Sequence, residues 1–138
     1  MSAFVIDASV AIALISPDEQ SDAVFALFDR MMDHGAFAPA LWLFETANAA
    51  RYKWTKSPMA AAVLREGVEK IHAFPVEFVE LEPRVVSGSV LTLALRHKLT
   101  VYDASYLHLA IALSLPLATL DRELIVAAPK ESVELISV

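Results

Sequence analysis

The sequence predicts an α/β fold in which a central, mainly parallel sheet is covered by helices on both faces. Short apolar runs of strand length alternate along the chain with longer segments whose apolar residues recur at helical spacing, and this alternation is typical of parallel sheets. Hydrophobic residues make up 57% of the 138 positions, which suggests either strands buried on both faces or an apolar surface that another chain covers. The length fits one folded unit, so we expect residues 1–138 to form a single domain.

The first half of the chain is expected to alternate strands and helices. The expected elements are a strand over 3–6, helices over 9–15 and 18–34, a strand over 36–38, and helices over 41–56 and 58–72. Proline and glycine mark their boundaries, because the first helix stops near Pro17, the second ends at Gly35, and Pro58 lies in the first turn of the last.

The second half continues the same alternation. The expected elements are a strand over 76–81, a helix over 84–97, a short apolar connection over 99–102, a helix over 104–113, a strand over 117–120, a helix over 122–128 and a last strand over 133–136. In parallel sheets of this kind, ligands gather beyond the carboxyl ends of the strands. The polar residues expected at that edge are therefore the candidates for function.

Composition excludes several kinds of protein. The chain has no cysteine, which excludes disulfides and thiolate-bound zinc, and three glycines are too few for a glycine-rich phosphate loop. No apolar run reaches the roughly 18 to 20 residues of a membrane span, and the N-terminus lacks the basic start of a signal peptide. We therefore expect a cytoplasmic protein without membrane contact. The net charge of −6 argues against a broad nucleic-acid surface but allows a small site where cations offset the acids.

Four carboxylates stand where predicted strands end or predicted helices begin. Asp7 ends the first strand, Asp121 follows the strand in LATLD, and Asp103 opens the helix in YDASYLHLA. Glu45 lies in the first turns of LWLFETANAA. Taken singly, each aspartate is explained as a helix N-cap, and Glu45 as a solvated residue or a partner of the helix dipole. Taken together, all four are expected at one edge of the sheet.

Carboxylates gathered in one cleft repel one another, and their pKa values rise unless a cation is present. Oxygen ligands in a chain without cysteine favour magnesium or manganese over zinc. Such a metal binds a phosphate oxygen, acidifies a water and stabilises a leaving oxygen. Ser9, Asn48 and Thr119 flank the same positions, and we expect them to contact the acids or the substrate.

Two other chemistries fit the sequence poorly. The four histidines, including His108, lie on different predicted elements, whereas acid–base catalysis needs groups within hydrogen-bond reach; we expect His108 to pack in the core. Phosphotransfer domains of the receiver type use an acidic pair near the end of the first strand. Haloacid-dehalogenase-like phosphatases need aspartates at the first and third positions of that loop, where this chain has Asp7 and Ser9.

Four segments together resemble the PIN-domain family, and within it the VapC-type toxins of toxin–antitoxin pairs. They are VIDAS at residues 5–9, FETANA at 44–49, YDASYLHLA at 102–110 and TLDREL at 119–124. They occur in the family's order and span nearly the whole chain. The resemblance implies a three-layer α/β/α fold and magnesium- or manganese-dependent endoribonuclease activity. It also implies attack by a metal-activated water, which leaves a 5′-phosphate and a 3′-hydroxyl.

By position, Asp7, Glu45, Asp103 and Asp121 correspond to the acidic quartet of that family. The resemblance implies that Asp7 and Asp103 are the firmest metal ligands and that Asp121 binds metal directly or through water. Glu45 would complete the cluster and help to orient or deprotonate the water. Thr119 matches the hydroxyl residue that often precedes the last acid.

The resemblance also implies an RNA substrate, a VapB-like antitoxin and a homodimer. Arg122 is the basic residue expected nearest the scissile phosphate. The segment RYKWTK at 51–56 and the cluster at 96–98 are either RNA contacts or solvated helix C-termini. Trp42 and Phe44 are assigned either to partner contacts or to the core.

Two alternatives keep the same fold. One is a PIN nuclease that processes RNA without an antitoxin, and the other is a PIN-fold binding module with a weak site. Four intact acids argue against the second of these.

Overall fold

The computed structural model describes residues 2–55 and 61–138, in which each strand is separated from the next by two or more helical segments. In chain order they are β1 (Phe4–Ile6), α1 (Ala8–Ile15), the 3₁₀ turn η1 (Pro17–Glu19), α2 (Asp22–His34), β2 (Ala36–Pro39), α3 (Trp42–Trp54), α4 (Ala61–His72), β3 (Val76–Val79), α5 (Pro83–Val85), the π-helical turn η2 (Val86–Val90), α6 (Leu91–His97), α7 (Val101–Leu113), β4 (Leu117–Ala118) and α8 (Arg122–Lys130).

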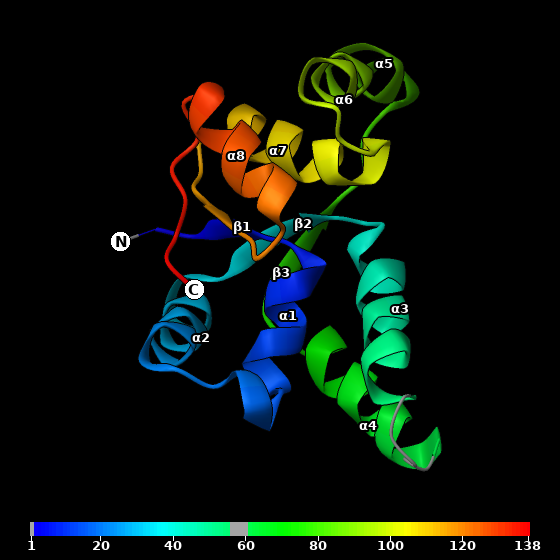
Figure 1. Ribbon diagram of the computed structural model, residues 1–138, viewed down its shortest axis with the longest axis vertical. Coiled ribbons are helices and arrows are strands. Elements are labelled where there is room, and N and C mark those ends of the chain that lie inside the picture. Colours follow the sequence, from blue (N-terminus) through cyan, green and yellow to red (C-terminus); the bar gives the residue numbers. More distant parts are fainter. Residues whose placement is uncertain (1, 56–60) are drawn as a thin grey trace.

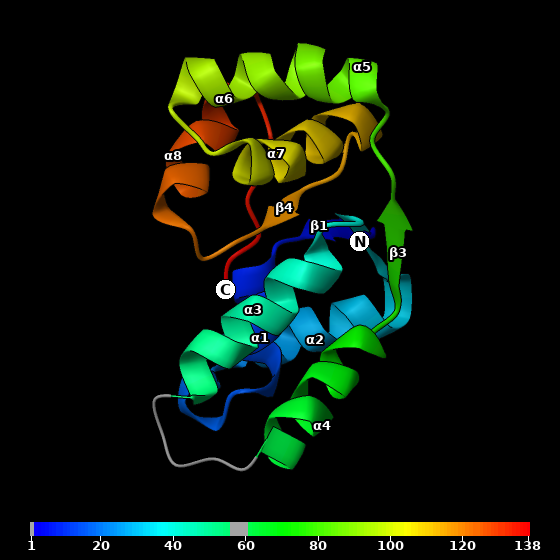
Figure 2. The same ribbon diagram turned by 90° about the vertical axis from the view of Figure 1, so that its right-hand side faces the viewer.

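The strands of the described residues form one four-stranded parallel sheet in the order β3-β2-β1-β4. Figures 1 and 2 show α1 to α4 on one side of this sheet and α5 to α8 on the other. The predicted three-layer α/β/α fold with a parallel sheet is therefore confirmed.

The sheet positions the site through the place where its strand order reverses. The chain moves outward from β1 to β2 and β3, and then crosses back to add β4 on the free side of β1. Val5 pairs with Phe37 on one side and with Leu117 on the other. The crevice beyond the carboxyl ends of β1 and β4 lies at this reversal, where open parallel sheets usually bind ligands.

The core consists of the central strand and the helices that cover it. All three residues of β1 are fully buried, as are the two largest core side chains, Trp42 and Tyr106. The Trp42 ring lies 6.0 Å from His72 and 5.8 Å from Phe78, measured between ring centroids. Trp42 is thus a core residue. Phe44, in contrast, is 81% exposed.

Some sequence-based boundaries are wrong. The predicted last strand at 133–136 is a tail that makes one isolated parallel bridge, between Leu117 and Leu135. The predicted connection at 99–102 instead contains the start of α7, because the Thr100 side chain caps this helix by accepting a hydrogen bond from the Asp103 amide at 3.1 Å. The predicted helix at 18–34 starts later, at Asp22, after the Ser21 cap.

The helix predicted at 84–97 is present as a continuous run of α5, η2 and α6, with a π-helical turn in the middle. Lys56 and Pro58, the predicted end and start of two neighbouring helices, lie outside the described residues. Within the described part of the chain, no helix has both the length and the apolar character needed to cross a membrane.

Candidate active site

The predicted acidic residues line one cleft beyond the ends of β1 and β4. The cleft has a volume of about 340 Å³, and its walls include Asp7, Glu45, Asp103 and Asp121. Each side chain is held by a different element, because Asp7 follows β1, Glu45 lies in the first turn of α3, Asp103 in the first turn of α7, and Asp121 just before α8. Residues far apart in the sequence therefore meet at one edge of the sheet.

Asp7 is the most buried of these acids, with 5% of its surface exposed. Its Oδ1 accepts a hydrogen bond from the Ser9 amide at 2.6 Å, and its Oδ2 accepts one from the Thr119 hydroxyl. Burial raises the pKa of Asp7, the hydrogen bonds from Thr119 and Ser9 oppose this, and the charge of Asp121 raises it further. A cation bound beside Asp7 would stabilise its ionised form and offset the unfavourable burial of the carboxylate.

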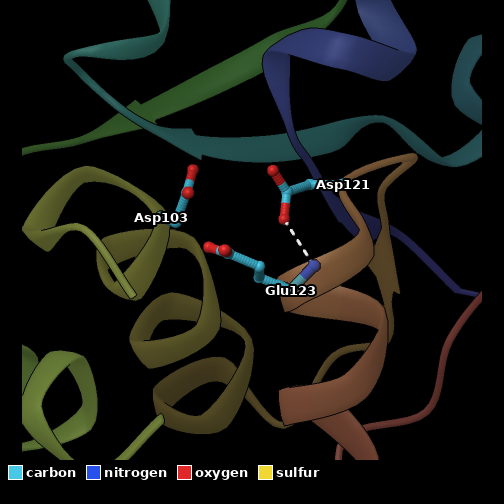
Figure 3. Close-up of side chains that lie close together, drawn as sticks. All are labelled: Asp103, Asp121 and Glu123. Atoms are coloured by element: carbon cyan, nitrogen blue, oxygen red, sulfur yellow. Dashed lines mark hydrogen bonds between the residues drawn. The ribbon is translucent and has the colours of Figure 1, made fainter. Parts of the chain in front are cut away.

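Asp121 caps α8 with one carboxylate oxygen, and its side chain also lines the cleft. Its Oδ1 accepts hydrogen bonds from the amides of Glu123 at 2.9 Å and Leu124 at 3.0 Å. Figure 3 shows Asp103, Asp121 and Glu123 facing one another across the gap between α7 and α8. One carboxylate oxygen from each of the three lies within 4.8 Å of the others.

Asp103 occupies the first turn of α7 and does not cap that helix. Burial, helped by the charges of Asp121, Asp7 and Glu123, raises its pKa to about 6, and only the hydrogen bond with Thr100 opposes the shift. The N-cap explanation therefore holds for Asp7 and Asp121, whose side chains also line the cleft, but not for Asp103.

Glu45 lines the same cleft without joining the close trio around Asp121. Its Oε1 accepts a hydrogen bond of 2.5 Å from the hydroxyl of Tyr106, a buried residue of α7. Burial raises the pKa of Glu45, the Tyr106 hydrogen bond opposes this, and the charges of Asp103 and Asp7 add to the rise. Glu45 is consequently held on the α3 side of the cleft with a fixed orientation.

The predicted supporting residues tie the acids together. The Thr119 hydroxyl donates to Asp7 and accepts from the Asp121 amide at 3.0 Å, so one side chain bridges two acids. The Ser9 hydroxyl accepts from the Leu120 amide at 3.1 Å and joins the turn after β1 to the turn after β4. Asn48 lines the cleft, as predicted.

The basic residues are divided between the acidic cleft and a separate groove. Arg122 lines a separate groove and is absent from the walls of the acidic cleft, whereas Arg51 and Tyr52 line that cleft. Within RYKWTK, Arg51 and Tyr52 therefore line the cleft, whereas Lys53 forms ion pairs with Asp18, at 3.2 Å, and with Glu19. Lys56 belongs to the undescribed residues. His108 is half-buried, and burial lowers its pKa.

Glu123 is the acid that sequence reasoning missed. It is exposed, and its carboxylate joins those of Asp103 and Asp121. The signal was present in TLDREL, since a residue two positions after an N-cap lies in the first turn of the helix, beside the cap.

The chemistry of these donors fits a hard divalent cation. All are carboxylates, three of them reach a common point, and the chain contains no cysteine. Burial, with a smaller contribution from mutual repulsion, raises the pKa values of Asp7, Glu45 and Asp103. A bound cation would stabilise their ionised forms and so oppose both effects.

Fold and cleft together define the class: an α/β protein with a carboxylate-rich, metal-compatible site beyond the ends of its parallel strands. A family model described as PIN domain matches residues 4–129, and the chain therefore belongs to the PIN domain family. PIN domains are typically metal-dependent nucleases, and they act on RNA or other nucleic acid.

Among solved structures, the chain is similar to the crystal structure of PAE2754 from Pyrobaculum aerophilum. The TM-score is 0.67 and the sequence identity 27%, over 91% of this chain and 84% of that chain. A search of curated proteins finds no match.

Proposed function

We propose that this protein is a magnesium-dependent endoribonuclease of the VapC toxin type, which a VapB-like antitoxin inhibits. The observation that carries the nuclease part is the convergence of Asp103, Asp121 and Glu123 within 4.8 Å, beside the buried Asp7. Membership of the PIN family supports this chemistry. The toxin role rests on the resemblance of the four sequence segments.

Asp7, Asp103 and Asp121 are proposed to hold the cation, with Glu123 as a further ligand. When bound, the cation lowers the pKa of a water and offsets charge on the phosphate. Manganese shares the preference for oxygen ligands and is the expected substitute.

The remaining polar groups orient the reaction. Glu45 is fixed by the Tyr106 hydroxyl, and we assign it the orientation of the attacking water and removal of its proton. Thr119 and Ser9 hold Asp7 in place through their hydrogen bonds. Asn48 and Arg51 line the wall of the cleft, where they would contact the RNA strand.

Partner binding is assigned to apolar surface beside the cleft. Phe44 precedes Glu45 and is 81% exposed, which is unusual for a large aromatic side chain. We propose that this surface contacts the antitoxin or a second copy in a homodimer.

The test is cleavage of total RNA by the purified protein and by Asp7→Asn, each with magnesium and with excess EDTA. Asn keeps the shape of Asp7 and removes its charge, so the proposal expects cleavage only by the wild type with magnesium. Glu134→Gln, which alters an exposed acid on the C-terminal tail, is the matched control and should cleave as the wild type does.

Equal cleavage in all samples would contradict a site built on these acids. Magnesium-dependent cleavage by the wild type, combined with the lack of a cognate antitoxin gene beside its own gene, would favour an RNA-processing nuclease over a toxin. Calorimetric titration with magnesium separates a selective enzyme, which binds the ion, from an inactive binding module, which does not.

A further inference from the structure

We propose that a second groove beside the acidic cleft binds the sugar–phosphate backbone of the RNA strand that reaches the acids. We call it the basic groove and define it by Arg96, Lys98, Arg122 and Lys130. It lies between the C-terminal end of α6 and α8 and has a volume of about 460 Å³. This inference rests on the proposed nuclease function.

The basic groove and the acidic cluster share a wall. Glu123 lines the groove and also belongs to the trio with Asp103 and Asp121. Figure 3 shows Glu123 in the first turn of α8, between that helix and α7, and Arg122 precedes it directly. A strand bound at the acids can therefore continue over the start of α8 into the groove.

The groove concentrates positive charge on an acidic protein. It holds four of the 11 lysine and arginine residues in a chain of net charge −6. Arg96 is paired with Glu131. Among the described residues, no carboxylate lies within ion-pair distance of Lys98, Arg122 or Lys130. Three unpaired cations around one groove favour an anionic ligand.

Helix electrostatics alone does not explain this cluster. Lys98 and Lys130 stand at the C-terminal ends of α6 and α8, where the helix dipole favours cations. Arg122 is the first residue of α8, where the dipole disfavours a cation. Lys98 also has a φ of 55°, in the left-handed region that glycine usually occupies at a helix end. The chain thus keeps Arg122 where the helix dipole disfavours a cation, and it keeps a lysine at position 98, where the backbone favours glycine.

The lining of the groove favours backbone phosphates over bases. Its apolar part is aliphatic, contributed by Val126 and Ala127, and among the described residues no Phe, Tyr or Trp lines it. The one aromatic ring in its wall, the imidazole of His97, is only 7% exposed and lies 3.3 Å from the Glu131 carboxylate. Bases are gripped by stacking on aromatic rings, whereas phosphates are held by Lys and Arg. The acidic cleft, in contrast, has Tyr52 and Asn48 in its wall. The groove should accordingly add affinity that does not depend on sequence.

The test measures binding of a short, fluorescently labelled oligouridylate in EDTA, where no cleavage interferes, between about 50 and 200 mM salt. The double variant Lys98→Asn with Lys130→Gln removes two groove cations, and Asn tolerates the left-handed backbone at position 98. The matched control, Arg65→Gln with Arg84→Gln, removes two exposed cations on α4 and α5, away from the groove.

The groove variant should bind several-fold more weakly, and the slope of log affinity against log salt should become shallower by about 1.4, because each lost phosphate contact contributes about 0.7. The control should retain the wild-type slope. The groove variant should lose the same fraction of its affinity for an oligoadenylate as for the oligouridylate. The proposal is overturned if the two double variants behave alike, or if wild type does not bind at low salt.

Failure of the groove and failure of the nuclease proposal give different patterns. Magnesium-dependent cleavage, together with equal salt slopes for the two double variants, would contradict RNA binding in the basic groove and would support the nuclease proposal. A groove-dependent slope without any magnesium-dependent cleavage would leave an RNA-binding surface beside an inactive site. Asp7→Asn should abolish cleavage and keep the groove-dependent slope.

Discussion

Individual residues in the cleft serve structure and site together. Asp7 and Asp121 both cap helices, and Thr119 bridges them with a single hydroxyl. Sequence reasoning treated capping and site membership as competing explanations for each aspartate. In the structure one carboxylate oxygen serves the helix while the side chain still lines the cleft, so the two explanations are compatible for these residues.

Tyr106 is the residue whose effect on the site is most open to a direct test. Its hydroxyl lowers the pKa of Glu45 by donating a hydrogen bond to the carboxylate. In Tyr106→Phe the pKa of Glu45 should rise. If Glu45 acts in its ionised form, the acidic limb of the pH–rate profile should then move to higher pH.

The measurement is the pH dependence of RNA cleavage by Tyr106→Phe, with Tyr102→Phe as control, since Tyr102 is 62% exposed. An unchanged acidic limb in Tyr106→Phe would show that Glu45 does not control the rate.

At the scale of elements, the sequence predicted the type and order of the helices and strands better than the residues at which they begin and end. The apolar and helical periods placed β1 to β4 and the main helices correctly. The start of α7 was missed because Val101 and Tyr102 are apolar, and their pattern does not distinguish a helix turn from an extended connection. The tail at 133–136 has a strand-like composition, but it makes only one bridge to Leu117.

The site was largely predictable because strand ends and helix starts determine which residues share an edge. Asp7, Glu45, Asp103 and Asp121 line the cleft as that rule requires. Arg122 lines the neighbouring groove instead of the cleft itself, because helix rotation, which sequence does not reveal at a first turn, sets the direction of its side chain. Its expected place near the scissile phosphate stays a prediction.

The cap of α7 provides a prediction at this scale. Thr100→Ala removes the hydroxyl that accepts from the Asp103 amide, and loss of an N-cap of this kind typically costs about 1 kcal/mol of stability. It also removes a hydrogen bond that lowers the pKa of Asp103.

Urea denaturation of Thr100→Ala should therefore give a lower free energy of unfolding than Thr92→Ala, which changes an exposed threonine on α6. Equal stabilities of the two variants would mean that solvent replaces the cap without loss.

For the whole molecule, the acidic cluster links stability to pH and to metal. Folded Asp103 holds its proton up to a pH of about 6, whereas the unfolded group loses it near 3.8. The folded state thus binds more protons in this window, and the free energy of unfolding falls as pH rises through it. The shift corresponds to about 3 kcal/mol, which solvent screening of this half-buried group reduces to roughly 1–2 kcal/mol.

We expect the metal-free protein to be less stable at pH 7 than at pH 5, and magnesium to restore stability at pH 7. Thermal unfolding at both pH values, in EDTA and in magnesium, measures this. Burial lowers the pKa of His108, which makes the free energy of unfolding rise with pH and so opposes the effect of Asp103. Comparison with Asp103→Asn therefore gives the contribution of Asp103 alone. At pH 7 in EDTA, Asp103→Asn should be more stable than the wild type, and magnesium should raise its stability by less. A wild-type protein insensitive to both pH and magnesium would contradict the linkage.

The tail beside β4 has a consequence for solubility. The backbone of Leu117 donates to Glu134 at 2.9 Å and accepts from Ile136 at 3.0 Å, so the tail occupies hydrogen-bonding groups that an edge strand would otherwise offer to another molecule. At the opposite edge, β3 carries the exposed residues Glu77 and Phe78. The tail therefore protects the β4 edge from pairing with another molecule. Edge-to-edge association of this sheet is left to β3, where the negative charge of Glu77 opposes it.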